Sequence, residues 1–149
     1  MYIYVIMFDR KAFFMKRRDA REALFVLLYE MSFNTPEELE ETILRAKETR
    51  DIEDAYIMQS IHGIYDHLEE IDQKIAAHAR GWSFERLSRT TLAIMRISIY
   101  EMHFAEIPYT ISINEALELA KKYDHDQAPT FINGILNAVA TASGLKNKA

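Results

Sequence analysis

Apolar side chains recur at helical spacing along most of this chain, and residues that interrupt helices are rare. Between residues 17 and 32, the apolar positions follow the i, i+3, i+4, i+7 pattern of one buried helix face. These positions are Ala20, Ala23, Leu24, Leu27, Leu28 and Met31. Only four glycines and three prolines occur in 149 residues, so few positions favour turns. The sequence therefore predicts an all-α protein.

Capping patterns and prolines divide the chain into about seven helices. The segment Thr35–Glu38 has the pattern of an N-cap, an N1 proline and a capping-box glutamate. The segment Ser112–Glu115 has the form of a second capping box, which would open another helix. Pro129 suits the first turn of a last helix. The expected helices cover residues 17–32, 36–47, 52–79 with a break near Asp66, 89–105, 112–123 and 129–142.

These helices are expected to form two packed helical bundles. Gly81 is a suitable C-cap for the long stretch before it, so we place an N-terminal subdomain at residues 15–80 and a C-terminal subdomain at residues 81–149. A faint repeat supports two similar halves, since residues 28–31 (Leu-Tyr-Glu-Met) recur as residues 99–102 (Ile-Tyr-Glu-Met). Residues 1–14 are apolar and β-prone and precede Met15, a plausible alternative start. We interpret them as an atypical N-terminal extension.

The sequence lacks the patterns of common catalytic, cofactor and metal sites. The absence of cysteine excludes disulfides, thiolate zinc sites and cysteine nucleophiles. The four glycines form no phosphate-binding loop, and none of the five histidines follows a glutamate at the spacing of a di-iron site. No apolar run reaches the ~18 residues of a membrane span, and the N-terminus does not resemble a signal peptide. We therefore expect a cytoplasmic protein that is not an enzyme and uses no cofactor.

A cluster of cations at the start of the first helix points to a polyanion. Lys16, Arg17, Arg18 and Arg21 lie within six residues, although the whole chain has a net charge of −5. Cations are disfavoured at the positive end of a helix dipole, so helix stability does not explain them. Arginine forks beside exposed backbone N–H groups suit phosphate. The alternative is a solubilising terminus with Glu22 as an ion-pair partner.

Aromatic residues gather at the expected junction between the last two helices. Tyr123 ends one helix and Phe131 begins the next, so both could stack on unpaired bases. Taken alone, Phe131 also fits the core, and we expect Trp82 to pack between the two halves. Gly134 lies inside the last helix, where glycine costs ~1 kcal/mol relative to alanine. A close helix crossing or a ligand backbone nearby would explain this glycine.

From Met15 to Leu145 the chain resembles the NusB family of bacterial transcription antitermination factors. Five ordered segments carry the resemblance, and together they form a specific match. They are Arg17–Ala23 leading to Leu28-Tyr29, Leu92–Ile97 leading to Tyr100-Glu101, Pro108-Tyr109, Asn114–Ala116 with Glu118–Lys121, and Phe131–Leu136.

The resemblance implies a two-bundle helical fold and a role in transcription. Members of the family bind the boxA element of ribosomal RNA leaders together with NusE, a ribosomal protein, and act on RNA polymerase. Residue by residue, the resemblance implies RNA contacts by Lys16, Arg17, Arg18, Arg21, Tyr123, Gln127 and Phe131, and a NusE contact by Tyr29. Gln127 stands where other members often carry an acid, and a neutral amide should repel phosphate less.

Two other functions and one assembly question stay open at this point. A NusB-like domain also precedes the catalytic domain of some ribosomal RNA methyltransferases, so the chain could be a non-catalytic accessory domain. It could also be a helical scaffold that binds only proteins. Some family members form homodimers that hide the RNA face, and the sequence does not say whether this chain does.

Overall fold

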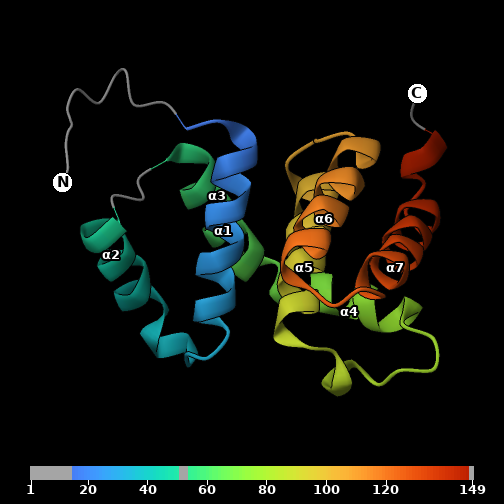
Figure 1. Cartoon of the computed structure of the whole chain (residues 1–149), viewed down its shortest axis with the longest axis horizontal. Helices are drawn as coiled ribbons and strands as arrows, with labels where there is room; N and C mark the ends of the chain where they lie inside the picture. The colour runs from blue at the N-terminus through green and yellow to red at the C-terminus, as the bar shows by residue number, and fades with distance from the viewer. Residues whose placement is uncertain (1–14, 51–53, 148–149) are drawn as a thin grey trace.

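The computed structural model describes residues 15–50 and 54–147, and within these residues it contains seven α-helices and no strand (Figure 1). The all-α prediction and the expected number of helices are confirmed. Residues 1–14, which we interpreted as an extension, lie outside the described residues. The helices are α1 (Arg17–Met31), α2 (Leu39–Arg50), α3 (Ala55–Asp66), α4 (Leu68–His78), α5 (Arg89–Phe104), α6 (Tyr109–Tyr123) and α7 (Ala128–Ala142).

The helices form two packed groups that meet along α5. Figure 1 shows α1, α2 and α3 on one side and α5, α6 and α7 on the other, with α4 running beneath α5 and α7. Helix α5 packs against α6 and α7 in its own group, and it also contacts α1 and α3 across the boundary. The two-bundle architecture is confirmed, whereas the division of the chain between residues 80 and 81 stays a prediction. Among the described helices, none combines the length and apolar character that a membrane span requires.

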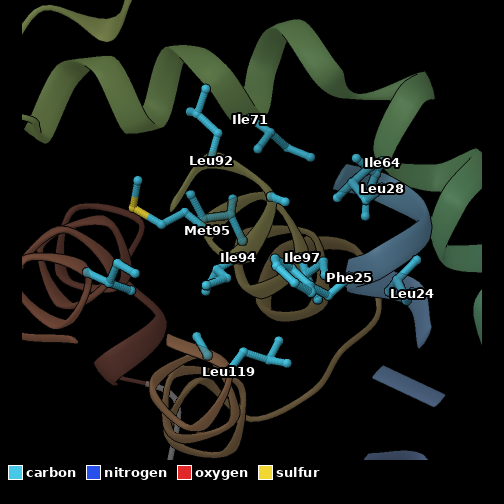
Figure 2. Close-up of a cluster of buried hydrophobic side chains, with 14 of the residues drawn as sticks. Leu24, Phe25, Leu28, Ile64, Ile71, Leu92, Ile94, Met95, Ile97 and Leu119 are labelled. Carbon is cyan, nitrogen blue, oxygen red and sulfur yellow. The ribbon is translucent and has the colours of Figure 1, made fainter. Parts of the chain in front are cut away.

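The hydrophobic core surrounds α5 on every side. Figure 2 shows side chains from α1, α3, α4 and α6 converging on this helix. Complete burial of one such leucine or isoleucine contributes about 1.5–3 kcal/mol, so the core fixes α1 and α6 firmly against α5. The core residues labelled in Figure 2 are Leu24, Phe25, Leu28, Ile64, Ile71, Leu92, Ile94, Met95, Ile97 and Leu119.

Most expected helix boundaries agree with the structure. The break near Asp66 occurs at His67, where α3 ends and α4 begins one residue later. The capping segment begins with a hydrogen bond of 3.0 Å between the Thr35 hydroxyl and the Glu38 carboxylate, followed by a short 3₁₀ turn and then α2. Pro129 lies in the first turn of α7 as expected. Gly81 has a φ of +78°, but α4 already ends at His78, so this glycine shapes the following turn instead.

The predicted start of the sixth helix is wrong. Helix α6 begins at Tyr109 directly after Pro108, one turn before the expected capping box. Ser112 is buried inside the helix, where its hydroxyl donates to the Ser98 carbonyl at 2.9 Å and contacts Glu101 at 3.1 Å. A serine and a glutamate three residues apart also share one helix face, so the same spacing arises inside a helix.

Candidate nucleic-acid interface

The basic cluster at the start of α1 separates into exposed and buried cations. Lys16 is the N-cap residue, with an extended backbone and an exposed side chain that caps no N–H group. Arg17 and Arg18 are also exposed, whereas only 5% of the Arg21 side chain is accessible. The cluster therefore offers three cations to solvent and directs the fourth into the protein.

Arg18 is held at the surface by a carboxylate of α6. Its Nε donates to Glu115 Oε1 at 3.0 Å and its Nη2 donates to Glu115 Oε2 at 2.7 Å. The hydrogen bond from Arg18 is the largest cause of a lowered pKa of Glu115, so this carboxylate stays ionised. The Arg18 side chain remains 64% exposed, and pairs this accessible contribute little to stability. A phosphate can therefore compete with Glu115 for the guanidinium.

Arg21, unlike the other three cations of the cluster, belongs to a buried network. Its Nε donates to Glu101 Oε2 at 2.8 Å, and Glu101 is completely buried. The Tyr56 hydroxyl also donates to Glu101, and burial followed by the charge of Glu101 raises the pKa of Tyr56. Arg21 Nη1 lies 3.4 Å from Glu115 Oε1. The network joins α1, α3, α5 and α6. Arg21 also lines a groove between α1 and α6, so an RNA contact by this residue stays a prediction.

Arg17 rests on the outer side of the same network. Its guanidinium carbon lies 4.4 Å from the centre of the Tyr56 ring, which is a cation–π distance. The arginine is exposed, so the contact orients the side chain without removing its charge from the surface. Arg17 and Arg18 are consequently both supported by residues anchored in the buried network.

The C-terminal end of α6 brings further polar groups beside α1. Lys122 Nζ lies 2.6 Å from Glu22 Oε2, and the Tyr123 hydroxyl donates to the same oxygen. The hydrogen bonds from Lys122 and Tyr123 lower the pKa of Glu22. The Tyr123 ring lies 4.8 Å from the Phe25 ring, so the tyrosine is supported on α1 while part of it stays exposed.

Arg18 and Lys122 line one groove of about 310 Å³ between α1 and α6. Its lining residues are Arg18, Arg21, Glu22, Glu115, Glu118, Leu119, Lys121 and Lys122. Sequence reasoning missed Lys121 and Lys122. Lysines in the last turn of a helix are favoured by the helix dipole, so their pattern gave no reason to look for another role.

A second groove of about 560 Å³ lies at the junction of α6 and α7. Gln127 is the N-cap of α7 and is exposed, and the half-buried Phe131 lies one turn later. Trp82 is 54% exposed and meets Phe131 edge to face at 6.0 Å, so our expectation that it packs between the halves is wrong. The lining residues are Trp82, Arg86, Leu87, Ser88, Thr91, His125, Gln127, Thr130 and Phe131.

Gly134 lies on the exposed surface of α7, one turn beyond Phe131. A Cβ atom at Gly134 would meet nothing within 4 Å, so a close helix crossing does not explain the glycine. Gly63 instead provides the close approach in this fold, because a Cβ there would overlap the Tyr100 ring. A ligand backbone beside Gly134 stays a prediction.

Tyr29 belongs to an aromatic row, made of Phe25, Tyr29 and Phe33, that runs along the second half of α1 and into the turn after it. Its ring lies 6.5 Å from Phe25 and 5.3 Å from Phe33, and the contact with Phe33 is edge to face. Tyr29 and Phe33 are both exposed, and Arg89 lies over the Phe33 ring at 4.3 Å. The row continues the surface that begins at Tyr123, because Phe25 contacts both tyrosines.

The sequence that forms these surfaces matches a known protein family. The model of the NusB family matches residues 18–141. This chain belongs to the NusB family. A relative from Clostridium novyi (strain NT), named transcription antitermination protein NusB, is 42% identical over 134 residues, covering 86% of this chain and 100% of the relative. The protein of the same name from a Nitratiruptor species is 40% identical over 126 residues, covering 83% of this chain and 91% of that protein.

Solved NusB structures share the fold. NusB of T. maritima superposes with a TM-score of 0.75 at 32% identity, covering 85% of this chain and 92% of that one. A structure of the antitermination factors NusB and NusE in complex with dsRNA gives a TM-score of 0.70 at 28% identity, covering 85% and 96%. Both grooves, the one between α1 and α6 and the one at the junction of α6 and α7, lie within the segment that matches the NusB family model.

Proposed function

We propose that this NusB-family chain is an RNA-binding transcription antitermination factor that recognises boxA RNA of ribosomal RNA leaders together with NusE. Its relatives carry the name transcription antitermination protein, and a structural neighbour was solved with NusE and dsRNA. Its part in transcription is non-catalytic. The RNA-bound assembly acts on RNA polymerase so that transcription continues through terminators.

One observation carries the proposal, namely that Tyr123, at the start of the junction between α6 and α7, lies against α1, the helix that carries the exposed cations. Lys16, Arg17 and Arg18 bind phosphates and set affinity. Tyr123 and Phe131 stack on unpaired bases, and Gln127 offers its amide to a base edge. Tyr123 contacts Glu22 of α1, which ties the aromatic junction to the helix that carries the cations.

Arg21 has a positioning role in this proposal. Its buried ion pair with Glu101 fixes the rotation of α1, and its second contact holds Glu115 where that carboxylate supports Arg18. RNA binding then exchanges the carboxylate partners of Arg18 and Lys122 for phosphates, which make charge-assisted hydrogen bonds of the same kind.

NusE is proposed to dock on the aromatic row that contains Tyr29. Exposed tyrosine and phenylalanine side chains supply contact area at protein interfaces, and Arg89 adds a cation beside Phe33. The chain has a net charge of −5, which complements the generally basic charge of ribosomal proteins. A homodimer of this chain would instead hide the RNA face, and size-exclusion chromatography with and without boxA RNA distinguishes the homodimer from the monomer.

Fluorescence anisotropy with a labelled boxA RNA tests the proposal. We expect tighter binding of boxA than of a scrambled RNA, and further tightening when NusE is added. Arg17→Ala and Arg18→Ala should weaken binding and lower the salt slope by about one unit for each lost phosphate contact. Arg45→Ala, which removes an exposed arginine from α2, serves as the matched control.

Equal binding of boxA and scrambled RNA, with and without NusE, would contradict this function. A protein-binding scaffold predicts a NusE complex that gains no RNA affinity, and an accessory domain of a methyltransferase predicts no effect on termination. Transcription through a boxA leader and a terminator, measured with purified RNA polymerase and NusE, provides the second readout. Read-through should require this chain and should decrease with Arg18→Ala.

A further inference from the structure

Trp82 occupies an unusual position for the single tryptophan of a small protein. It lies in the segment between α4 and α5, directly after Gly81, and 54% of the residue is exposed. Its indole is nevertheless supported, because it meets the Phe131 ring edge to face with ring centres 6.0 Å apart. The pair therefore forms an aromatic wall that still offers apolar surface to a ligand.

The groove beside this wall has the size and lining of a nucleotide site. Its volume is about 560 Å³, and its lining combines the two aromatic rings with exposed groups that donate or accept hydrogen bonds. Gln127 and Thr130 are exposed on the α7 side. Arg86 lies in the short 3₁₀ turn before α5, and within the described residues it makes no ion pair.

Hydrogen bonds hold the walls of the groove together before any ligand arrives. The Thr91 hydroxyl donates to Asp124 Oδ2 at 2.7 Å, and the backbone N–H of His125 donates to Asp124 Oδ1 at 2.8 Å. The first bond attaches the loop between α6 and α7 to the first turn of α5, and the second bond lies within the loop itself. His125 and Gln127 are thus presented from a fixed loop, which reduces the entropy lost on binding.

We propose that this groove binds one unpaired nucleotide, with its base stacked on Trp82 and its phosphate beside Arg86 and His125. The inference rests on the proposed RNA-binding function and extends the RNA contacts to the segment before α5. Gln127 and Thr130 face the edge of the same base, so the site prefers a single-stranded region in which that edge is free. The strand then passes from the cations of α1, across Tyr123, to Trp82.

The fluorescence of Trp82 reports on this site directly, because the sequence contains no other tryptophan. We expect a single-stranded boxA RNA to quench the emission of the full chain along the same curve that anisotropy gives. Trp82→Ala should weaken RNA binding roughly 5- to 160-fold, the range for loss of one stacked base. Trp82→Phe retains a ring and should recover most of the affinity. Arg86→Gln should weaken binding and lower the salt slope.

Leu44→Ala is the matched control, since Leu44 is 56% exposed and lies on α2, outside the lining of both grooves. It should leave RNA affinity unchanged. RNA binding by anisotropy with unchanged tryptophan emission and an unaffected Trp82→Ala variant would overturn the inference and leave the proposed function standing. Quenching by NusE without RNA would also overturn it, because the groove would then bind protein. Failure of the wild-type chain to bind any RNA would instead refute the proposed function.

Discussion

Replacing Arg21 with alanine separates the structural arginine of α1 from the arginines proposed to bind RNA. The Arg21 side chain is 5% exposed and Glu101 is completely buried, so removing Arg21 leaves a buried carboxylate without its charged partner. Breaking a buried pair in this way typically costs about 3–5 kcal/mol in the free energy of unfolding. The Tyr56 and Ser112 hydroxyls still contact Glu101, which favours the lower half of that range.

Urea unfolding followed by far-UV circular dichroism measures this loss. With an m-value of about 2 kcal/mol/M, a destabilisation of about 4 kcal/mol moves the midpoint of Arg21→Ala down by about 2 M. Arg18→Ala should leave the midpoint almost unchanged, because the Arg18 pair is exposed to solvent. Arg21→Ala should therefore be the less stable of the two variants. Arg18→Ala should have the lower RNA affinity per folded molecule.

A double-mutant cycle with Glu101→Gln isolates the pair itself. The glutamine keeps one acceptor oxygen, although Tyr56 and Ser112 donate to different oxygens of Glu101, and it removes the charge that Arg21 neutralises. Arg21→Ala combined with Glu101→Gln should be less destabilised than the sum of the single variants, with a coupling of about 1–3 kcal/mol. Additive effects, or an Arg21→Ala midpoint equal to that of Arg18→Ala, would refute the buried-pair reasoning.

The carboxylates of the first groove and the glycine of α7 give three further predictions. Glu22→Gln releases Lys122 and Tyr123, so RNA affinity measured by anisotropy at low salt should rise a few-fold. The pKa values of Glu22 and Glu115 are lowered in the folded state. Their contribution to stability is therefore present above the unfolded value of about 4.3 and is lost as the pH falls through the lower folded values. The urea midpoint should fall over that interval, and less so in a Glu22→Gln, Glu115→Gln double variant. Gly134→Ala should raise the free energy of unfolding by up to about 1 kcal/mol, because the site is open and helical. If an RNA backbone approaches Gly134, the same variant binds RNA more weakly, whereas unchanged affinity would remove the ligand from that position.

Local signals were sufficient for most of the fold. The break at His67 and the proline at the start of α7 depend on residues within one or two turns, and both were predictable. The start of α6 was not, because Ser112 and Glu115 have the spacing of a capping box and also of one helix face. Whether Ser112 caps the helix or lies inside it depends on its contacts with Ser98 and Glu101, which belong to α5.

The candidate site was predictable as a cluster but not as individual roles. Charge alone located Lys16, Arg17, Arg18 and Arg21, yet it could not show that Arg21 turns inward, because its partner lies 80 residues away in α5. Trp82 presents the opposite case, since a large apolar residue is normally expected inside and here is half exposed. Sequence patterns report what a residue prefers on average, whereas the neighbours that decide its role come from distant helices.

The contrast between Arg18 and Arg21 explains how one short helix segment serves both stability and binding. The two residues are three positions apart, so they lie on adjacent parts of one helix face, and Glu115 contacts both. The inner arginine is paired with Glu101, which is completely buried. The outer arginine, Arg18, is paired with Glu115 at the surface. A phosphate can replace Glu115 as its partner at little cost in stability. Because Glu115 contacts both Arg21 and Arg18, it orients the exposed Arg18 side chain relative to the buried network before an anion binds.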